Sequence, residues 1–210
     1  MRQRREIRAK CLVSADFAAT MGPMSSSALL VMDVQAGIVE RVGERAAPLL
    51  AALVQATNAA RGAEVAVIYV RVAFRAGAPE ISAHNRTFSA LAAAMAEDAP
   101  GTQVHEAVAP RAGDIVVVKK RVSAFAGSDL DVVLRSLEVR SLVLTGIATS
   151  GVVLSTLRQA ADLDFELTVL SDGCADGDAE VHRVLMEKVF PRQAAVMTTA
   201  QWVSQLQASS

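Results

Sequence analysis

The sequence predicts an α/β fold built around a mainly parallel sheet. Short runs rich in Val, Leu and Ile alternate with longer Ala-rich stretches to the end of the chain. The short runs are continuously apolar, which is typical of strands that are buried on both faces. Strands that alternate with helices in this way form parallel sheets covered by helices on both sides.

The elements can be assigned in order along the chain. Strands are expected in six short apolar runs bounded by polar or turn-forming residues, at 28–34, 64–72, 114–118, 141–145, 166–171 and 195–198. Helices are expected where the stretches between them have helical spacing, at 48–61, 88–96, 129–137, 152–163, 178–190 and around Trp202. Three of these helices carry end signals, because Gly62 and Pro191 favour termination and Ser128 can cap an N-terminus.

Length and composition indicate one compact domain, which we expect over residues 28–210 of the 210-residue chain. Hydrophobic residues make up 52% of the sequence, which is typical of a folded enzyme-like domain rather than a disordered chain. The net charge is −1, so no strong field attracts the chain to nucleic acid or to an anionic membrane. We therefore expect neither nucleic acid nor a membrane as a partner.

The N-terminal residues 1–27 differ from the rest and are expected to be a flexible extension. They lack the apolar centre of a secretory signal. No apolar run in the chain reaches the roughly 18 residues that a membrane span requires. Two cysteines, Cys11 and Cys174, do not make a disulfide framework, so a cytoplasmic location is expected.

Three segments distant in sequence are predicted to meet at one edge of the sheet. Asp33 stands near the end of the first predicted strand, Lys119 follows the third, and the loop 146–152 follows the fourth. Ligands of open parallel sheets bind beyond the carboxyl ends of the strands, near a reversal in strand order. This convergence predicts a site that contains Asp33 and Lys119.

Four motifs of the chain resemble those of the isochorismatase-like hydrolases, often called cysteine hydrolases. They are L-L-V-M-D-V-Q with Asp33, K-K-R-V-S-A-F from Lys119, T-G-I-A-T-S-G-V-V-L-S-T over 145–156, and L-S-D-G-C-A-D over 170–176. The resemblance covers about residues 28–202. It implies a Rossmann-like three-layer α/β/α sandwich around a six-stranded parallel sheet, and a homodimer or homotetramer.

The resemblance also implies roles for the site residues. In the family's thiol members an Asp takes the proton of the nucleophilic Cys and a Lys steadies the charges; Asp33 and Lys119 match these two residues. Val152 stands where the nucleophilic Cys would be, so covalent thiol catalysis at this position is excluded. The backbone N–H groups of Ala148 and Val152 match the family's oxyanion hole. A non-proline cis peptide bond is expected at Ile147–Ala148.

The other candidates are weaker. Cys174 is expected to be a buried structural thiol rather than a replacement nucleophile. Metal-dependent relatives carry an Asp with histidines after the second strand. That stretch offers only His84 here, so neither a catalytic metal nor a cofactor is expected. Five residues near the predicted site are candidates for substrate binding: Gln35, Ile38, Phe74, Arg86 and Phe125. Arg86 would bind a carboxylate through two parallel hydrogen bonds.

The leading functional hypothesis is a cofactor-free hydrolase that uses Asp33 and Lys119 on a small carboxylated or amide-like metabolite. Isochorismatases proper also lack the Cys and hydrolyse a vinyl ether, with the Asp supplying a proton to the substrate. Their loop reads G-V-Y-A-H-x-G-C, whereas Ala148, Thr149 and Ser150 stand here. The alternatives are a non-catalytic ligand-binding protein and a cysteine amidohydrolase that recruits another thiol.

Overall fold

The computed structural model describes residues 26–209. They form a six-stranded sheet in the order β3-β2-β1-β4-β5-β6, and each neighbouring pair of strands is parallel. The strands are β1 (Ser27–Met32), β2 (Ala66–Val72), β3 (Ile115–Lys119), β4 (Ser141–Ile147), β5 (Glu166–Ala175) and β6 (Ala195–Met197). The sequence-based prediction of the sheet is therefore confirmed.

The helices lie between these strands, as expected. They are α2 (Ala36–Val39), α3 (Ala46–Gly62), α4 (Arg86–Ser89), α5 (Leu130–Ser136), α6 (Leu154–Asp162), α7 (Ala179–Val184) and α8 (Thr199–Ser209). Short 3₁₀ and π segments complete the chain: η1 (Glu40–Arg45), η2 (Ala92–Met95), η3 (Pro100–Thr102), η4 (Glu106–Val108), η5 (Thr149–Val153), η6 (Leu185–Val189) and η7 (Phe190–Arg192). Within residues 26–209, no helix has the length and apolar character needed to cross a membrane.

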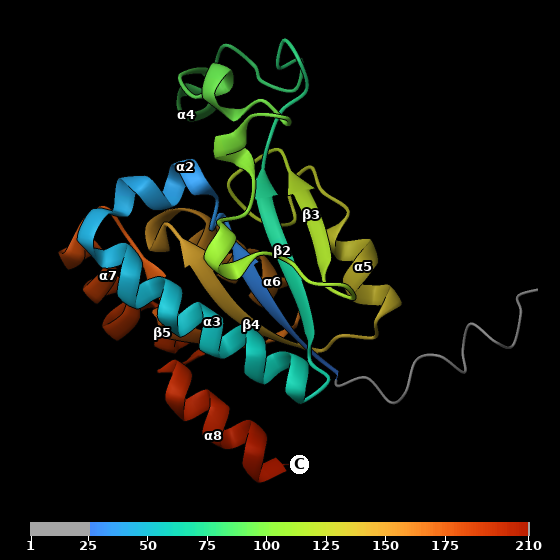
Figure 1. Ribbon diagram of the computed structural model, residues 1–210, viewed down its shortest axis with the longest axis vertical. Helices are drawn as coiled ribbons and strands as arrows, with labels where there is room; N and C mark the ends of the chain where they lie inside the picture. Colours follow the sequence, from blue (N-terminus) through green and yellow to red (C-terminus); the bar gives the residue numbers. More distant parts are fainter. Residues whose placement is uncertain (1–25, 210) are drawn as a thin grey trace, which may run out of the picture.

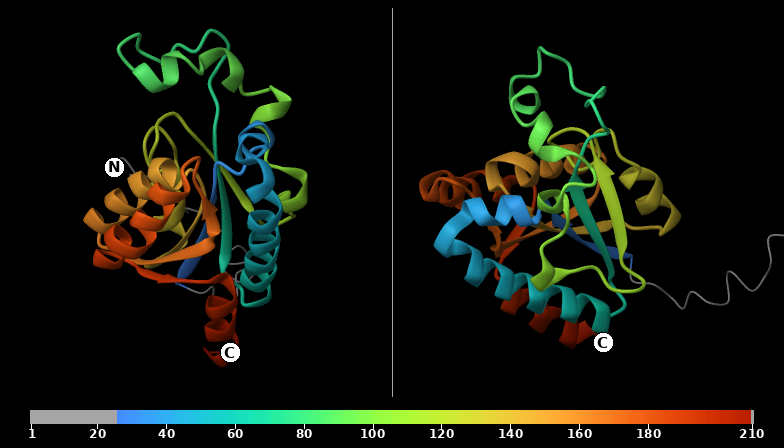
Figure 2. Two further views of the ribbon diagram at one scale, coloured as in Figure 1. Left: turned by 90° about the vertical axis from the view of Figure 1, so that its left-hand side faces the viewer. Right: turned by 45° about the horizontal axis from the view of Figure 1, so that its top comes forward.

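Helices cover both faces of the sheet, which makes the fold a three-layer α/β/α sandwich (Figures 1 and 2). On one face α3 and α8 bury a cluster that includes Leu53 and Trp202. On the other face α5 and α6 bury a second cluster that includes Leu134 and Leu157. Both faces of the strands are thus removed from water, which is why the strands are continuously apolar.

Two predicted helices are wrong as single units. The helix expected over 88–96 is divided into α4 and η2, and the chain after η2 is extended and pairs with Phe74. The Phe74 N–H donates to the Met95 carbonyl at 2.8 Å, and the Glu97 N–H donates to the Phe74 carbonyl at 3.0 Å. The helix expected over 178–190 changes from α7 to the π segment η6, and Pro191 lies inside η7.

The N-terminal boundary can be tested only in part. Of the expected extension over 1–27, residues 1–25 lie outside the described residues. Ser27 already belongs to β1, one residue before the expected start of the domain.

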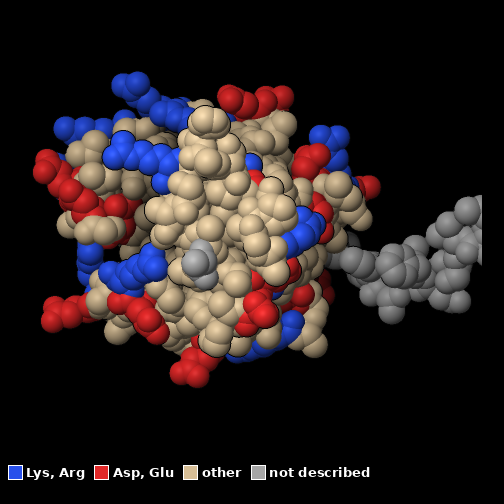
Figure 3. All heavy atoms as spheres, turned by 90° about the horizontal axis from the view of Figure 1, so that it is seen from above, with Lys and Arg blue, Asp and Glu red and all other residues tan. Residues whose placement is uncertain are grey.

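The strand order reverses between β1 and β4, and this reversal positions the site. Gly146 of β4 has a φ of +139°, and a Cβ atom there would lie 2.1 Å from the Met32 carbonyl oxygen of β1. Only glycine fits this approach. Ligands of such sheets bind at the carboxyl edge near the reversal. In Figure 1 the segment that carries α4 rises above this edge, and Figure 3 views the same end, where uncharged side chains fill the middle and charged ones surround them.

Candidate active site

Asp33 and Lys119 form a buried ion pair at the carboxyl edge of the sheet. Asp33 directly follows β1, and Lys119 is the last residue of β3. The Lys119 Nζ lies 2.9 Å from the Asp33 Oδ2, and both side chains are buried. The same Nζ donates to the carbonyls of Arg121 and Val122, each at 3.0 Å. The three protons of the ammonium group are therefore all engaged.

The second oxygen of the Asp33 carboxyl group differs from the first. Oδ1 is buried and has no hydrogen-bond partner among residues 26–209. The Asp33 backbone is in the left-handed region, with a φ of +56°, and its N–H donates to the Val70 carbonyl at 2.7 Å. Burial raises the pKa of Asp33 above its ordinary value, and the opposing effect of Lys119 is smaller. The Asp33 carboxyl group is therefore protonated more readily than an aspartate side chain in water.

A cavity of about 330 Å³ opens beside this pair. Asp33 and Lys119 line it together with Ala148 and Val152. The Ile147–Ala148 peptide bond is cis, as the family resemblance predicted. The cavity thus brings together the acid, the lysine and the loop that carries Val152, from three distant segments of the chain.

The rest of the cavity wall is mainly apolar. The additional lining residues come from α2, η1, β2, β4, η5, the 86–95 segment and the loops after β3 and β5: Ile38, Arg41, Val42, Val72, Thr87, Phe88, Leu91, Met95, Val122, Ile147, Gly151 and Gly177. Of the five expected substrate-binding residues, Ile38 alone belongs to this lining. The other four lie elsewhere.

Gln35 has a structural role in the described chain. Its side-chain amide donates to the carbonyls of Val72 at 3.0 Å and Thr102 at 2.8 Å, and its Oε1 accepts from the Val72 N–H at 2.8 Å. These bonds hold the end of β2 to η3. Because the amide is fully buried and bonded to the backbone, it does not face the cavity.

The two phenylalanines and Arg86 also lie outside the cavity lining. The Phe74 ring packs edge-on against Phe88, with centroids 5.4 Å apart. The Phe125 ring packs against Phe165 at 6.2 Å and belongs to the core beneath α5 and α6. Arg86, the first residue of α4, is exposed.

Sequence reasoning missed Arg41 and Thr87 as lining residues. A signal existed for Arg41, because Ile38, Arg41 and Val42 recur at helical spacing directly after Asp33. No comparable signal marked Thr87, because the 86–95 segment was predicted with the wrong helix boundaries. Its position depends on long-range contacts rather than on local pattern.

A second missed feature holds the loop that carries Val152. The Thr149 Oγ1 lies 2.8 Å from the His182 Nδ1, and the Ser150 N–H donates to the Asp176 Oδ2 at 2.7 Å. Partial burial lowers the pKa of His182, which favours the neutral ring. Thr149 is fully buried and is not part of the cavity lining, so the His182 contact fixes the loop and activates no exposed hydroxyl.

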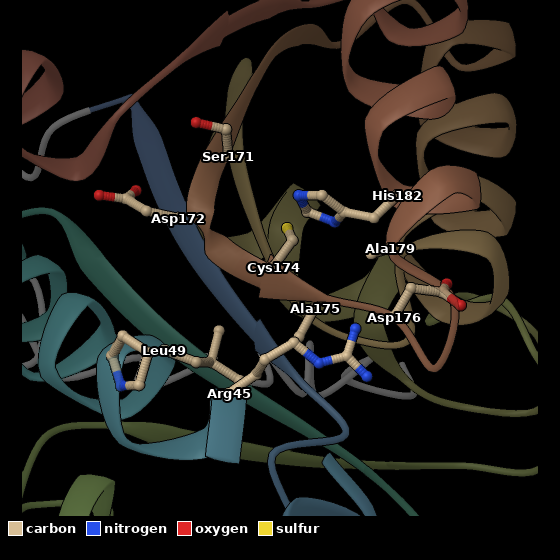
Figure 4. A pocket seen from close by; sticks show the side chains of 10 residues that line it. Arg45, Leu49, Ser171, Asp172, Cys174, Ala175, Asp176, Ala179 and His182 are labelled. Carbon is tan, nitrogen blue, oxygen red and sulfur yellow. The ribbon is translucent and has the colours of Figure 1, made fainter. Parts of the chain in front are cut away.

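Cys174, the cysteine within residues 26–209, lines a different cavity, of about 280 Å³. Figure 4 shows the Cys174 side chain in this second cavity, with its sulfur directed toward His182. Burial raises the pKa of Cys174 to about 12, and its Sγ lies 3.9 Å from the Leu144 carbonyl oxygen. Neither Asp33 nor Lys119 lines this cavity. In the described part of the chain, no group of three or more His, Cys, Asp or Glu side chains could hold a metal ion.

Comparison with known proteins agrees with this fold. A family model described as the isochorismatase domain matches residues 27–201. The chain belongs to the isochorismatase family. It is thus a member of a hydrolase superfamily, and its three-layer fold is that of the family.

Individual relatives support the assignment. The chain is 31% identical over 210 aligned residues to ureidoacrylate amidohydrolase RutB of Stutzerimonas stutzeri, covering 88% of this chain and 81% of the relative. The crystal structure of a cysteine hydrolase from Pseudomonas syringae pv. phaseolicola has a TM-score of 0.83 at 26% identity and covers 90% of this chain and 97% of its own. An isochorismatase family protein from Burkholderia thailandensis has a TM-score of 0.77 at 27% identity, covering 89% and 97%.

Proposed function

We propose that this family member hydrolyses a small metabolite by acid–base chemistry at Asp33, assisted by Lys119 and without a cysteine nucleophile. The observation that carries the proposal is the Asp33 Oδ1, which is buried beside the cavity and has no hydrogen-bond partner in the described residues. A buried carboxyl oxygen without a partner is unfavourable unless a proton or a ligand satisfies it. A substrate in the cavity would supply that partner.

Lys119 fixes the Asp33 carboxyl group and its charge. Its ammonium group is already bonded to Asp33 and to two backbone carbonyls, so it has no remaining proton for the substrate. Its role is to orient Oδ2 and to stabilise the carboxylate that forms when Asp33 gives up a proton. Asp33 is therefore the acid–base residue, and Lys119 acts through it.

Val152 restricts the chemistry to direct attack by water, because its side chain has no proton to lose and no nucleophilic atom. In a vinyl ether, Asp33 would protonate the double bond, water would add to the resulting cation, and the hemiacetal or hemiketal would release the alcohol. In a C–N substrate, ionised Asp33 would take a proton from water as it attacks the carbonyl and pass it to the leaving nitrogen. The N–H groups of Ala148 and Val152 would then hold the oxyanion.

A non-catalytic ligand-binding protein is the second candidate. The buried apolar side chain of Val152 at the family's nucleophile position favours it. The buried Asp33–Lys119 pair favours the enzyme, because an apolar binding pocket gains nothing from the desolvation of two charges. The Stutzerimonas relative is named a ureidoacrylate amidohydrolase, which makes ureidoacrylate a second test compound beside isochorismate.

The test measures pyruvate release from isochorismate and loss of ureidoacrylate, for the wild type, Asp33→Asn and Asp172→Asn. Asp172 lines the second cavity and gives a matched control for the loss of one carboxylate. Turnover that disappears in Asp33→Asn and persists in Asp172→Asn supports the hydrolase. Equal turnover in the wild type and Asp33→Asn would refute the mechanism. Binding of either compound without turnover would favour the ligand-binding protein.

A further inference from the structure

Of the charged side chains that line the main cavity, two form an ion pair with each other and one does not. Three ionisable side chains belong to its wall: Asp33, Lys119 and Arg41. When Asp33 is ionised, its charge and that of Lys119 cancel within their ion pair at 2.9 Å, and protonation of Asp33 would only add positive charge. Arg41 therefore leaves the cavity with one uncompensated positive charge, which favours an anionic ligand.

The Arg41 side chain has no partner among the described residues, unlike three other arginines near this edge. Arg45, four residues later in η1, donates to the Gly177 carbonyl at 3.1 Å and lines the second cavity. Arg71 donates to the Glu97 carbonyl at 3.2 Å, and Arg75 pairs with Glu80 at 2.7 Å. The Arg41 side chain has neither a hydrogen bond nor an ion pair within residues 26–209, and it is exposed.

The two groups that lack partners lie on the same cavity wall but in different environments. The Asp33 Oδ1 is buried, whereas Arg41 is exposed to solvent and lies with Thr87 among the exposed lining residues. Apolar side chains such as Ile38, Phe88 and Val152 complete the lining. This arrangement suits a molecule with a carboxylate, an apolar body and a reacting group.

We infer that Arg41 binds the carboxylate of the substrate, whose apolar body lies against the cavity wall and whose reacting group meets Asp33. A guanidinium group binds a carboxylate through two parallel N–H···O bonds, and no other cation of the lining has donors to offer. The reacting end of this assignment rests on the proposed function; the carboxylate end rests on the charges of the cavity alone. Arg41 thus replaces Arg86 as the expected carboxylate-binding arginine.

The experiment uses trans-cinnamate and its neutral analogue cinnamamide as probes, with affinities measured by ligand-observed NMR. Cinnamamide is itself an amide, so the same NMR spectra must show that no cinnamate forms from it during the measurement; the affinities then do not depend on hydrolysis. The variants are Arg41→Gln, which removes the charge, Arg41→Lys, which keeps it, and Arg45→Gln, which removes the neighbouring arginine of η1. A thermal unfolding measurement verifies that each variant is folded.

The wild type should bind cinnamate more tightly than cinnamamide. Arg41→Gln should weaken cinnamate binding about tenfold and leave cinnamamide unchanged, because one charge-assisted contact is lost at an exposed position. Arg41→Lys should retain part of the preference, and Arg45→Gln should retain all of it. Equal affinities for the two probes in the wild type, or an equal loss in Arg45→Gln, would overturn the inference.

Turnover separates this inference from the proposed function. If the preference for cinnamate depends on Arg41 while isochorismate and ureidoacrylate are not hydrolysed, the carboxylate site stands and the hydrolase mechanism fails. If Asp33-dependent turnover is found with a KM that is unchanged in Arg41→Gln, the mechanism stands and the carboxylate site is refuted.

Discussion

The two cavities at the carboxyl edge of the sheet have similar volumes but are lined by different reactive side chains. The main cavity, of about 330 Å³, holds a buried Asp–Lys pair and is lined by Val152. The second cavity, of about 280 Å³, holds the thiol of Cys174 beside His182. Both are bordered by η1 and by the connection after β5. Cavity size therefore does not identify the reactive site here, whereas the placement of titratable groups does.

The contrast lies in the effect that desolvation has on the reactivity of each group. Burial disfavours the charged form of both Asp33 and Cys174, and it raises the pKa of each. For a carboxyl group this shift favours the protonated form, which aids acid catalysis. For a thiol the same shift removes the thiolate and its nucleophilicity. One physical cause thus favours chemistry in the first cavity and opposes it in the second.

The largest expected effect is that of Asp33→Asn. Activity should fall by about 10²–10⁴-fold, because the amide cannot exchange the proton that general acid–base catalysis requires. The measurement is kcat/KM with the substrate that gives turnover. Asp172→Asn, at the second cavity, should keep activity within about a factor of two, since most substitutions away from a site act through stability alone. A comparable loss in both variants would erase the distinction between the cavities.

Lys119→Met should strongly destabilise the protein. It leaves the Asp33 carboxylate buried without its cation, which costs about 3–5 kcal/mol. The free energy of unfolding in urea measures this loss. The double variant Asp33→Asn/Lys119→Met should recover part of it, because no charge remains unpaired. If the double variant loses as much stability as the sum of the two single variants, the two residues are not coupled.

The pH dependence of kcat/KM tests the protonation state of Asp33. The protonated acid is the active form in the vinyl ether mechanism, and burial raises the pKa of Asp33. Activity should therefore be constant below this pKa and fall about tenfold per pH unit above it. A midpoint above the ordinary range of an aspartate is expected. A rate that rises with pH through this range would instead identify ionised Asp33 as a base.

The smallest effect is expected at the thiol. Cys174→Ala should leave activity within about a factor of two and cost about 1 kcal/mol of stability, as for other small buried side chains. In a Cys11→Ser background, Cys174 should also resist iodoacetamide, because with a pKa of about 12 it is hardly ionised at pH 8. Rapid labelling in the folded protein, or loss of activity in Cys174→Ala, would return the thiol to the list of catalytic candidates.

Much of the fold and part of the site follow from the sequence. Period and length of the apolar runs predicted the six parallel strands, because burial on both faces requires continuous apolar residues. The ends of these runs predicted that Asp33 and Lys119 meet, because parallel strands bring their carboxyl ends to one edge. The 2.9 Å ion pair agrees with that expectation. Both inferences rest on local patterns that the sequence displays directly.

Only the tertiary structure decided which side chains face the cavity. Gln35 and Ile38 lie three residues apart after β1, yet Gln35 bonds to the backbone of β2 and Ile38 lines the cavity. The contact of Thr149 with His182 joins residues 33 positions apart. Within residues 26–209, the lack of a partner for the Asp33 Oδ1 and for the Arg41 side chain likewise depends on how distant segments pack. Such relations are set by long-range packing and desolvation, which leave no periodic trace in the sequence.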